Sequence, residues 1–416
     1  MFAVRQRFPS ESIHDIGAVV GAGVGANLKD LGMAAGAEVA IAVGSRGVTP
    51  LGEVVAAIVS ATLGAGLRPF IVPAMGSHGG ATAEGQSAVL AGLGIDEAGV
   101  GAPMRSSMET ALLGHTSAGV PVHLDRHALA ADALIVLGRV KPHTGFRGAI
   151  ESGLCKMLAV GLGKIDGARA LHAAGLAATI PAAAEIILSA RPRSIGVALI
   201  ENAYERVAAV EIVHAQRFAE TDRTLLKAAW KLLPRIPVEA ADLLIVEELG
   251  KDISGTGMDP NIIGMWRRFG GERTPNFARV AALRLSRGSH GNANGIGLAD
   301  FTTRTTADAI DWSETYTNAL TALDPGIAHL PVTLPTDYAC IETALALCRR
   351  ERGGEPTVVR IRSTRELTYL SISENLIGHL PDDVTITRSA SGETLAFDDA
   401  GVLLPDQRWA AYHANV

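Results

Sequence analysis

Short apolar runs that end in glycine-containing loops constrain the fold of this chain more than any other feature. Residues 38–43 have the pattern of a buried strand, and residues 51–63 have the length and composition of a helix. A second apolar run covers residues 69–73, and another helix begins near Thr82. A repeated order of strand, loop and helix is typical of a parallel sheet covered by helices. The sequence therefore predicts an α/β fold.

The loops after these strands carry the first candidate functional residues. Ser45 and Arg46 follow the first strand, and His78 follows the second. His143 follows a further apolar run at residues 133–137. Parallel strands end at one edge of a sheet, and ligands of open α/β sheets bind outside that edge. We therefore expect the three loops to converge.

His78 and His143 lie in loops that contain glycine or proline, so core packing explains neither of them. A single loop histidine is usually a structural hydrogen-bonding residue. Two of them on one sheet edge also fit general acid–base catalysis, because imidazole titrates near neutral pH. One ring can take a proton on one face of a substrate while the other delivers a proton on the opposite face. Inversion of a stereocentre requires this arrangement.

Lys156 stands in the apolar segment Leu154-Cys155-Lys156-Met157-Leu158. Such a lysine usually extends its amine to solvent. A buried lysine can instead bind anions or act as a nucleophile, because burial lowers its pKa. Cys155 fits a small core residue. Beyond this segment, the Ala-rich residues 168–190 are expected to be helical.

The chain is too long for one ordinary core, because it has 416 residues. We expect a first α/β domain over residues 1–238 and a second over 239–416, joined by a helix at 219–233. Each domain is predicted to hold a mainly parallel sheet flanked by helices, with the active site in the interdomain cleft. The C-terminal tail is a candidate for packing back onto the first domain. The loop at Lys251 is expected to close over the site.

Composition excludes several classes of protein. The formal net charge is −6 and no basic run occurs, so nucleic acid is not an expected partner. No apolar run reaches membrane-spanning length, and the N-terminus has no signal-peptide pattern. The three cysteines form no paired framework, which favours a reducing compartment. These features predict a cytoplasmic protein with no membrane partner.

Four features in the right order, and a fifth in the second half of the chain, resemble the nickel-dependent lactate racemase superfamily. Ser45-Arg46-Gly47-Val48-Thr49-Pro50 is similar to the Arg-Pro-Thr-Pro loop of that family, and Gly76-Ser77-His78 is similar to its Gly-Thr-His. Pro142-His143, followed by glycine-rich sequence and Lys156, resembles its Pro-His to Gly-Gly-Ala-Lys run. His172 follows Lys156 at the spacing of the family, and Gly250-Lys251-Asp252 resembles its Pro-Lys-Asp loop.

This resemblance implies a racemase or 2-epimerase of a 2-hydroxy acid that works by hydride transfer to and from a nickel-pincer nucleotide. The resemblance makes Lys156 the covalent attachment point, His172 the protein ligand of nickel, and His78 and His143 the acid–base pair. Arg46 and Lys251 would hold the substrate carboxylate, and the Ser45–Arg46 loop would also contact the cofactor. Enzymes that make the cofactor are the implied partners. Gly-Leu-Cys replaces Gly-Gly-Ala before Lys156, and the substrate stays open between lactate and a larger acid such as a sugar acid.

Two other functions stay open on the residues alone. The glycine loops also suit a dehydrogenase with exchangeable NAD, although neither loop has the GxGxxG pattern. Helix N-termini after such loops bind phosphate or carboxylate, which fits a non-catalytic binding protein for an anionic metabolite.

Overall fold

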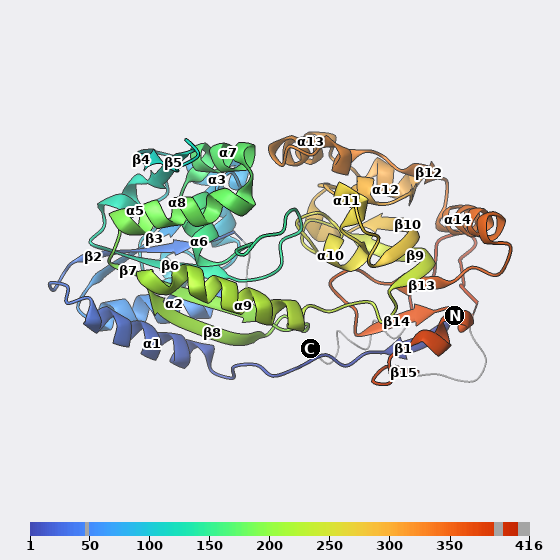
Figure 1. Cartoon of the computed structure of the whole chain (residues 1–416), viewed down its shortest axis with the longest axis horizontal. Helices are drawn as coiled ribbons and strands as arrows, with labels where there is room; N and C mark the ends of the chain where they lie inside the picture. Colours follow the sequence, from blue (N-terminus) through green and yellow to red (C-terminus); the bar gives the residue numbers. More distant parts are fainter. Residues whose placement is uncertain (46–49, 387–393, 407–416) are drawn as a thin grey trace. The chain divides into compact units, whose positions relative to one another are not determined.

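The computed structural model describes residues 1–45, 50–386 and 394–406 of the chain. The chain divides into two compact units, one of which is Pro9–Leu233. The other unit combines Met1–Phe8 with Pro234–Val416. Both are α/β units, as the sequence predicts (Figure 1).

A five-stranded sheet in the order β3-β2-β6-β7-β8 forms the centre of the first unit. Its strands are β2 (Glu38–Val43), β3 (Arg68–Pro73), β6 (Ala133–Arg139), β7 (Ser194–Glu201) and β8 (Val207–His214). The first four run parallel and β8 is antiparallel to β7. The predicted strands that precede the three loops are therefore confirmed, and their carboxyl ends share one edge. A separate hairpin is formed by β4 (Thr110–His115) and β5 (Pro121–Asp125).

Alternation along the strands divides the apolar side chains of this unit into two cores. In β2, Val39 and Ile41 pack with helices α1 and α2, whereas Ala40 and Ala42 pack with helices α8 and α9 on the opposite face. Figure 1 shows α1 and α2 on one side of the sheet and α8 on the other. The helices are α1 (Ile16–Asp30), α2 (Leu51–Gly64), α3 (Ala83–Ala91), α4 (Glu97–Val100), α5 (Arg126–Ala130), α6 (Leu154–Lys156), α7 (Lys164–Ala174), α8 (Leu176–Ala190) and α9 (Phe218–Leu232).

The second unit is built on an eight-stranded sheet in the order β12-β11-β10-β9-β13-β14-β1-β15. Its strands are β1 (Phe2–Arg5), β9 (Ala240–Leu249), β10 (Asn276–Leu285), β11 (Phe301–Thr303), β12 (Val332–Leu334), β13 (Val358–Ile361), β14 (Tyr369–Ile372) and β15 (Thr385–Ile386). Strands β9 to β13 run parallel to one another, and β13 is antiparallel to β14. Its helices are α10 (Pro260–Ile263), α11 (Trp266–Phe269), α12 (Arg304–Asp308), α13 (Trp312–Thr321) and α14 (Asp337–Arg352). In the described part of the chain, no helix is both long enough and apolar enough to cross a membrane.

The division between the units differs from the predicted boundary of 238/239. It falls at 233/234, and the first eight residues belong to the second unit. The reason is long-range pairing, because β1 forms an antiparallel ladder with β14 and so satisfies backbone groups that an edge strand would leave open. Figure 1 marks the N-terminus beside β14.

The described part of the C-terminal tail has contacts within the second unit. The guanidinium of Arg360 donates to the carbonyl oxygen of Leu404 over 2.7 Å, and Ser371 donates to Asp406 over 3.1 Å. Helix α9, expected as the connector, instead contributes Leu225 and Leu226 to a core of the first unit.

Candidate active site

The loops after β2 and β3 pack against the π-helical turn Met157–Gly161, which directly follows Lys156. A Cβ atom added at Gly44 would lie 3.2 Å from Cε of Met157. The backbone N–H of Gly76 donates to the carbonyl oxygen of Gly161 over 3.0 Å. The segment that carries Lys156 is therefore built against both loops.

His78 is exposed on the loop after β3 and is joined to the loop after β2 by one hydrogen bond. Its Nδ1 atom lies 2.6 Å from Oγ of Ser45. The direction of this bond depends on the tautomer of the ring. When Nδ1 donates to Ser45, Nε2 carries a lone pair that can accept a proton. Arg46, the next residue, lies outside the described residues.

His143 is half-buried in the loop after β6, and a backbone contact favours one tautomer of its ring. The N–H of Gly145 donates to Nδ1 over 2.9 Å. Because Nδ1 accepts this bond, the neutral ring carries its hydrogen on Nε2. In this state His143 is a hydrogen-bond donor through Nε2.

A buried carboxylate that was not singled out from the sequence shapes this loop. The side chain of Glu151 is 2% exposed, and its Oε2 accepts the N–H of His143 over 2.7 Å. Its Oε1 accepts the N–H of Gly148 over 3.2 Å. The guanidinium of Arg147 lies 3.6 Å from the same carboxylate. Glu151 therefore holds both ends of the segment that carries His143.

Phe146 links His143 to Lys156. The ring centroids of His143 and Phe146 are 4.4 Å apart, and Nζ of Lys156 lies 5.8 Å from the centroid of Phe146. Burial lowers the pKa of His172, and the positive charge of Lys156 lowers it further. The structure thus brings His143, Lys156 and His172 together, and it favours a neutral imidazole at His172.

Asp222 fixes the backbone at the start of the short helix that holds Lys156. Its two carboxylate oxygens accept the N–H groups of Leu154 over 2.9 Å and of Cys155 over 2.8 Å. Gly153 has φ +91°, and a Cβ atom there would lie 2.2 Å from Asp222, so only glycine fits. Burial raises the pKa of Asp222 to about 6. Burial also raises the pKa of Cys155, which is a core residue, as expected.

A buried lysine lies beneath the His78 loop, and the sequence reasoning missed it. Lys164 is fully buried, and its ammonium donates to the carbonyl oxygen of Pro73 and, over 3.1 Å, to Oε1 of Gln86. Oδ2 of Asp125, also fully buried, lies 3.3 Å from the same ammonium. In sequence Lys164 follows a glycine and precedes a polar helix start, which is the ordinary pattern of a surface lysine.

In the second unit, Lys251 lies on the loop that follows β9. Its ammonium donates to the carbonyl oxygen of Gly255 over 3.0 Å and to the side chain of Asn318 in α13. Asp252 accepts a hydrogen bond from Ser286. Both side chains thus have partners within their own unit, and the substrate contact expected of Lys251 stays a prediction.

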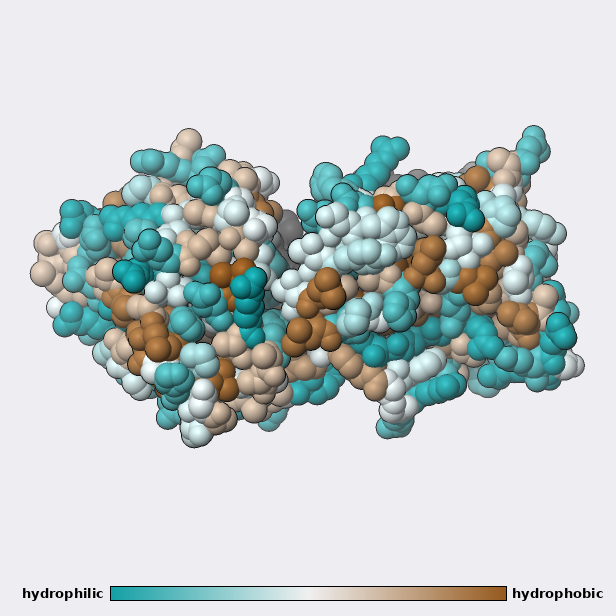
Figure 2. Space-filling view, turned by 90° about the horizontal axis from the view of Figure 1, so that it is seen from above, coloured by the Kyte–Doolittle hydropathy of each residue, from teal (hydrophilic) through white to brown (hydrophobic). Residues whose placement is uncertain are grey.

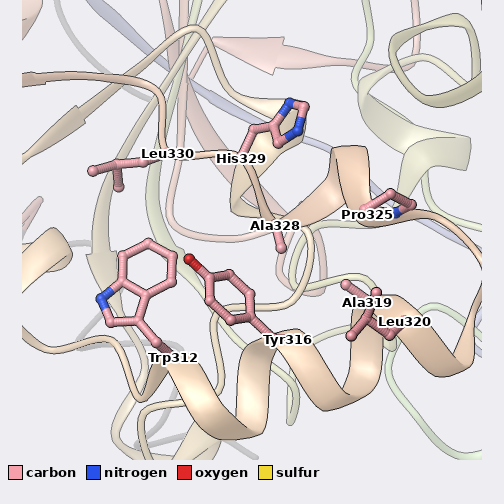
Figure 3. A pocket seen from close by; sticks show the side chains of 8 residues that line it. All are labelled: Trp312, Tyr316, Ala319, Leu320, Pro325, Ala328, His329 and Leu330. Carbon is pink, nitrogen blue, oxygen red and sulfur yellow. The ribbon is translucent and has the colours of Figure 1, made fainter.

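A pocket of about 410 Å³ opens beside α13 (Figure 3). Figure 3 shows Trp312 and Tyr316 projecting from the helix toward it, and their ring centroids are 5.3 Å apart. Figure 2 looks onto this side and shows apolar residues among polar ones; Leu320 is 62% exposed and Leu330 is 45% exposed. None of the residues predicted to form the site lines this pocket.

A family model matches part of the first unit. Residues 24–179 match the model described as the lactate racemase N-terminal domain. This segment is similar to a lactate racemase N-terminal domain. It contains His78, His143, Lys156 and His172, together with the buried residues Glu151 and Lys164. A search of curated proteins finds no match to the chain.

One solved structure extends the likeness of fold beyond residues 24–179. A crystal structure of a protein from Thermotoga maritima is 16% identical, with a TM-score of 0.50, and the match covers 75% of this chain and 83% of that one. At this identity the likeness shows the fold alone. The lactate racemase apoprotein from Thermoanaerobacterium thermosaccharolyticum is 12% identical over 86% of this chain and 94% of that one, with a TM-score of 0.48.

One histidine of residues 24–179 has the properties of a metal ligand. Among the described residues, no group of three or more histidine, cysteine or acidic side chains is placed to hold a metal ion. His172 offers a single imidazole whose lowered pKa keeps it neutral and able to ligate. Lys156 lies close enough to affect that ring and stands at the end of α6.

Proposed function

We propose that this protein is a racemase or 2-epimerase of a 2-hydroxy acid that uses a nickel-pincer nucleotide. The family of residues 24–179 supports a racemase-type activity in general. One observation carries the finer proposal. His143 and Lys156 lie against the ring of Phe146, the charge of Lys156 reaches His172, and the loop that bears His78 packs against the turn after Lys156.

Lys156 and His172 are the residues proposed to hold the cofactor. Lys156 is the covalent attachment point, and the neutral imidazole of His172 is the protein ligand of nickel. When bound, the cofactor supplies a centre that accepts hydride from C2 of the substrate and returns it. Asp222 accepts the N–H groups of Leu154 and Cys155 and so fixes the backbone of α6. This contact keeps Lys156 in a defined position.

The two loop histidines move the proton of the substrate hydroxyl. His78 serves as the base when its Nδ1 donates to Ser45, because Nε2 of the neutral ring is then the atom that accepts a proton. His143, whose Nδ1 accepts from Gly145, donates a hydrogen bond through Nε2 to the substrate oxygen. For the opposite enantiomer the roles are exchanged, and His143 gives up its contact with Gly145 to act as the base.

Two cations are proposed to bind the carboxylate of the substrate. Arg46 is the first candidate, because it follows in sequence directly after Ser45, whose hydroxyl contacts His78. Lys251 is the second candidate, and its bonds to Gly255 and Asn318 hold the ammonium at the loop after β9. A guanidinium pairs with a carboxylate in two-point geometry, which would fix the acid group while C2 inverts. The Ser45–Arg46 loop is also the proposed contact for the cofactor.

Isotope retention tests this proposal. The protein, made together with the enzymes that synthesise the cofactor, is incubated in D2O with single enantiomers of lactate and of sugar acids. We expect racemisation or epimerisation with the C2 hydrogen retained, because hydride transfer does not exchange it with solvent. His78→Ala and His143→Ala should each lower kcat at least about 100-fold, whereas His14→Ala, at an exposed position of the same unit, should not.

Three results would contradict the proposal. Deuterium at C2 of the product would indicate proton abstraction in place of hydride transfer. Binding of free NAD without any nickel requirement would favour a dehydrogenase. Ligand binding that survives both histidine substitutions, with no turnover of any 2-hydroxy acid, would favour a binding protein for an anionic metabolite.

A further inference from the structure

The buried ammonium of Lys164 connects three segments of the first unit. It donates to the carbonyl oxygen of Pro73 at the end of β3 and to Oε1 of Gln86 in α3. It also lies 3.3 Å from the carboxylate of Asp125 at the end of β5. The side chains of Lys164, Gln86 and Asp125 are fully buried. A charge in the interior is tolerated only when it is paired and hydrogen-bonded, as this one is.

Gln86 continues this network to the His78 loop. While its Oε1 accepts from Lys164, its amide nitrogen donates to the carbonyl oxygen of Gly76 over 2.8 Å and to that of His78 over 3.3 Å. Lys164 therefore fixes which end of the Gln86 amide faces the loop, since an ammonium can only donate. The loop is held from beneath by two bonds that reach residues on both sides of Ser77.

The position of Lys164 in the fold explains why this link matters. Lys164 is the first residue of α7, and the same helix carries His172 two turns later. Its backbone has φ +51°, a conformation that lysine rarely adopts, so the surrounding contacts hold the residue in this position. One buried side chain thus joins the helix of one site residue to the loop of another.

We propose that Lys164 and Gln86 are positioning residues that set the imidazole of His78 for proton transfer. This inference rests on the proposed function for its catalytic meaning. Its structural part is that Lys164 and Gln86 determine the position of the His78 ring, and this part holds whatever reaction the protein catalyses. Neither side chain touches the substrate, because both lie below the loop in the interior.

The chain offers a matched control. Gln6 is a buried glutamine of the second unit whose amide nitrogen likewise donates to two carbonyl oxygens, those of Arg235 over 3.0 Å and Leu367 over 2.8 Å. Gln86→Leu and Gln6→Leu therefore remove the same kind of contact. Only the first change lies beneath His78.

The first measurement is made on the protein without cofactor. Long-range ¹H–¹⁵N NMR spectra report the ring nitrogens of each histidine, and the His78 signals are assigned by their loss in His78→Gln. We expect Gln86→Leu to shift both ring nitrogens of His78 and to leave those of His143 in place, since Glu151 holds that loop. Gln6→Leu should leave both rings unchanged.

Two further variants keep the test decisive if Gln86→Leu fails to fold. Gln86→Glu has the same shape and can pair with Lys164, but it has no N–H to donate to the loop. Lys164→Met combined with Asp125→Asn removes the ammonium without leaving an unpaired buried carboxylate. Each should shift the His78 signals. Unchanged His78 signals in folded Gln86→Glu, or an equal shift in Gln6→Leu, would overturn the inference.

The loaded enzyme supplies a second readout. Misplacing a catalytic group without altering substrate contacts lowers kcat more than it changes KM. We expect Gln86→Glu to lower kcat about 10-fold or more with KM within about twofold. An NMR shift with no racemase activity even in the wild-type protein would contradict the proposed function and leave the positioning of His78 standing. Normal kcat in Gln86→Glu would overturn the positioning role.

Discussion

At the scale of single residues, the site depends on which ring nitrogen of each histidine is held. His143 accepts a backbone N–H at Nδ1, whereas His78 faces a serine hydroxyl that can donate or accept. A hydroxyl adapts to both protonation states of an imidazole, but a backbone N–H does not. The two rings are therefore not equivalent, and Ser45 allows His78 to change its charge state.

Replacing Ser45 tests this difference. Ser45→Ala removes the 2.6 Å contact to Nδ1 of His78, so the ring loses its preferred orientation. We expect kcat to fall about 10-fold and the pH profile of kcat/KM to shift, while KM changes little. Ser60→Ala, at an exposed position in α2, is the control. Wild-type kcat with an unchanged pH profile in Ser45→Ala would exclude this role.

The residues that sequence reasoning identified and those that it missed differ in kind. His78, His143 and Lys156 are found from local sequence, because a histidine in a glycine loop or a lysine in an apolar run stands out. Lys164 acts through contacts with residues far along the chain, and Glu151 acts from a buried position. Charged residues are rarely buried, so sequence alone gives no reason to place them inside.

At the scale of elements, the short helix α6 is held by a carboxylate whose ionisation opposes folding. Burial raises the pKa of Asp222 from 3.8 to about 6, so the folded protein favours the protonated form. The contribution of this group to stability is complete below pH 3.8. It is lost as the pH rises through about 6. The loss amounts to about 3 kcal/mol.

The non-titrating variant Asp222→Asn should reveal this dependence. We expect the free energy of unfolding of the wild-type protein to fall, relative to that of the variant, as the pH rises from about 4 to 7. Urea unfolding of both proteins at several pH values measures the difference, and other titrating groups cancel in the comparison. A difference that is constant with pH would show that Asp222 keeps an ordinary pKa.

Helices and strands could be predicted where neighbouring residues carry the signal. The prediction failed where a single residue interrupts a helical pattern. The strands of the first unit follow from their apolar runs, and three of them were expected within one or two residues. The Ala-rich segment 168–190 suggested one helix, but Gly175 has φ +89° and separates α7 from α8. The helix that carries His172 therefore ends at Ala174, two residues after the histidine.

At the scale of the whole molecule, the N-terminus belongs to the second unit. Strand β1 pairs with β14 on one side and with β15 on the other, and Gln6 is bonded to Arg235 and Leu367. The sequence could not indicate this, because the pairing joins residues at opposite ends of the chain. The domain boundary predicted from proline positions was therefore incomplete.

Deleting residues 1–8 should weaken the second unit selectively. The deletion leaves β14 without one of its two antiparallel neighbours, since β13 remains, and it removes the buried side chain of Val4. We expect faster amide hydrogen exchange in β14 and unchanged exchange in β2 and β6. Mass spectrometry of peptides from the intact and the shortened chain measures both. Equal exchange in β14 of the two chains would contradict this account of the N-terminus.

The central claim is that Lys156 carries the nickel-pincer nucleotide, and intact mass tests it most directly. The protein is expressed together with the cofactor-making enzymes, and its mass and nickel content are measured beside those of Lys156→Ala and Lys227→Ala, the latter at an exposed position in α9. We predict a covalent adduct with bound nickel in the wild-type protein and in Lys227→Ala, and its loss in Lys156→Ala. An unmodified wild-type mass, or an adduct that survives in Lys156→Ala, would contradict the claim.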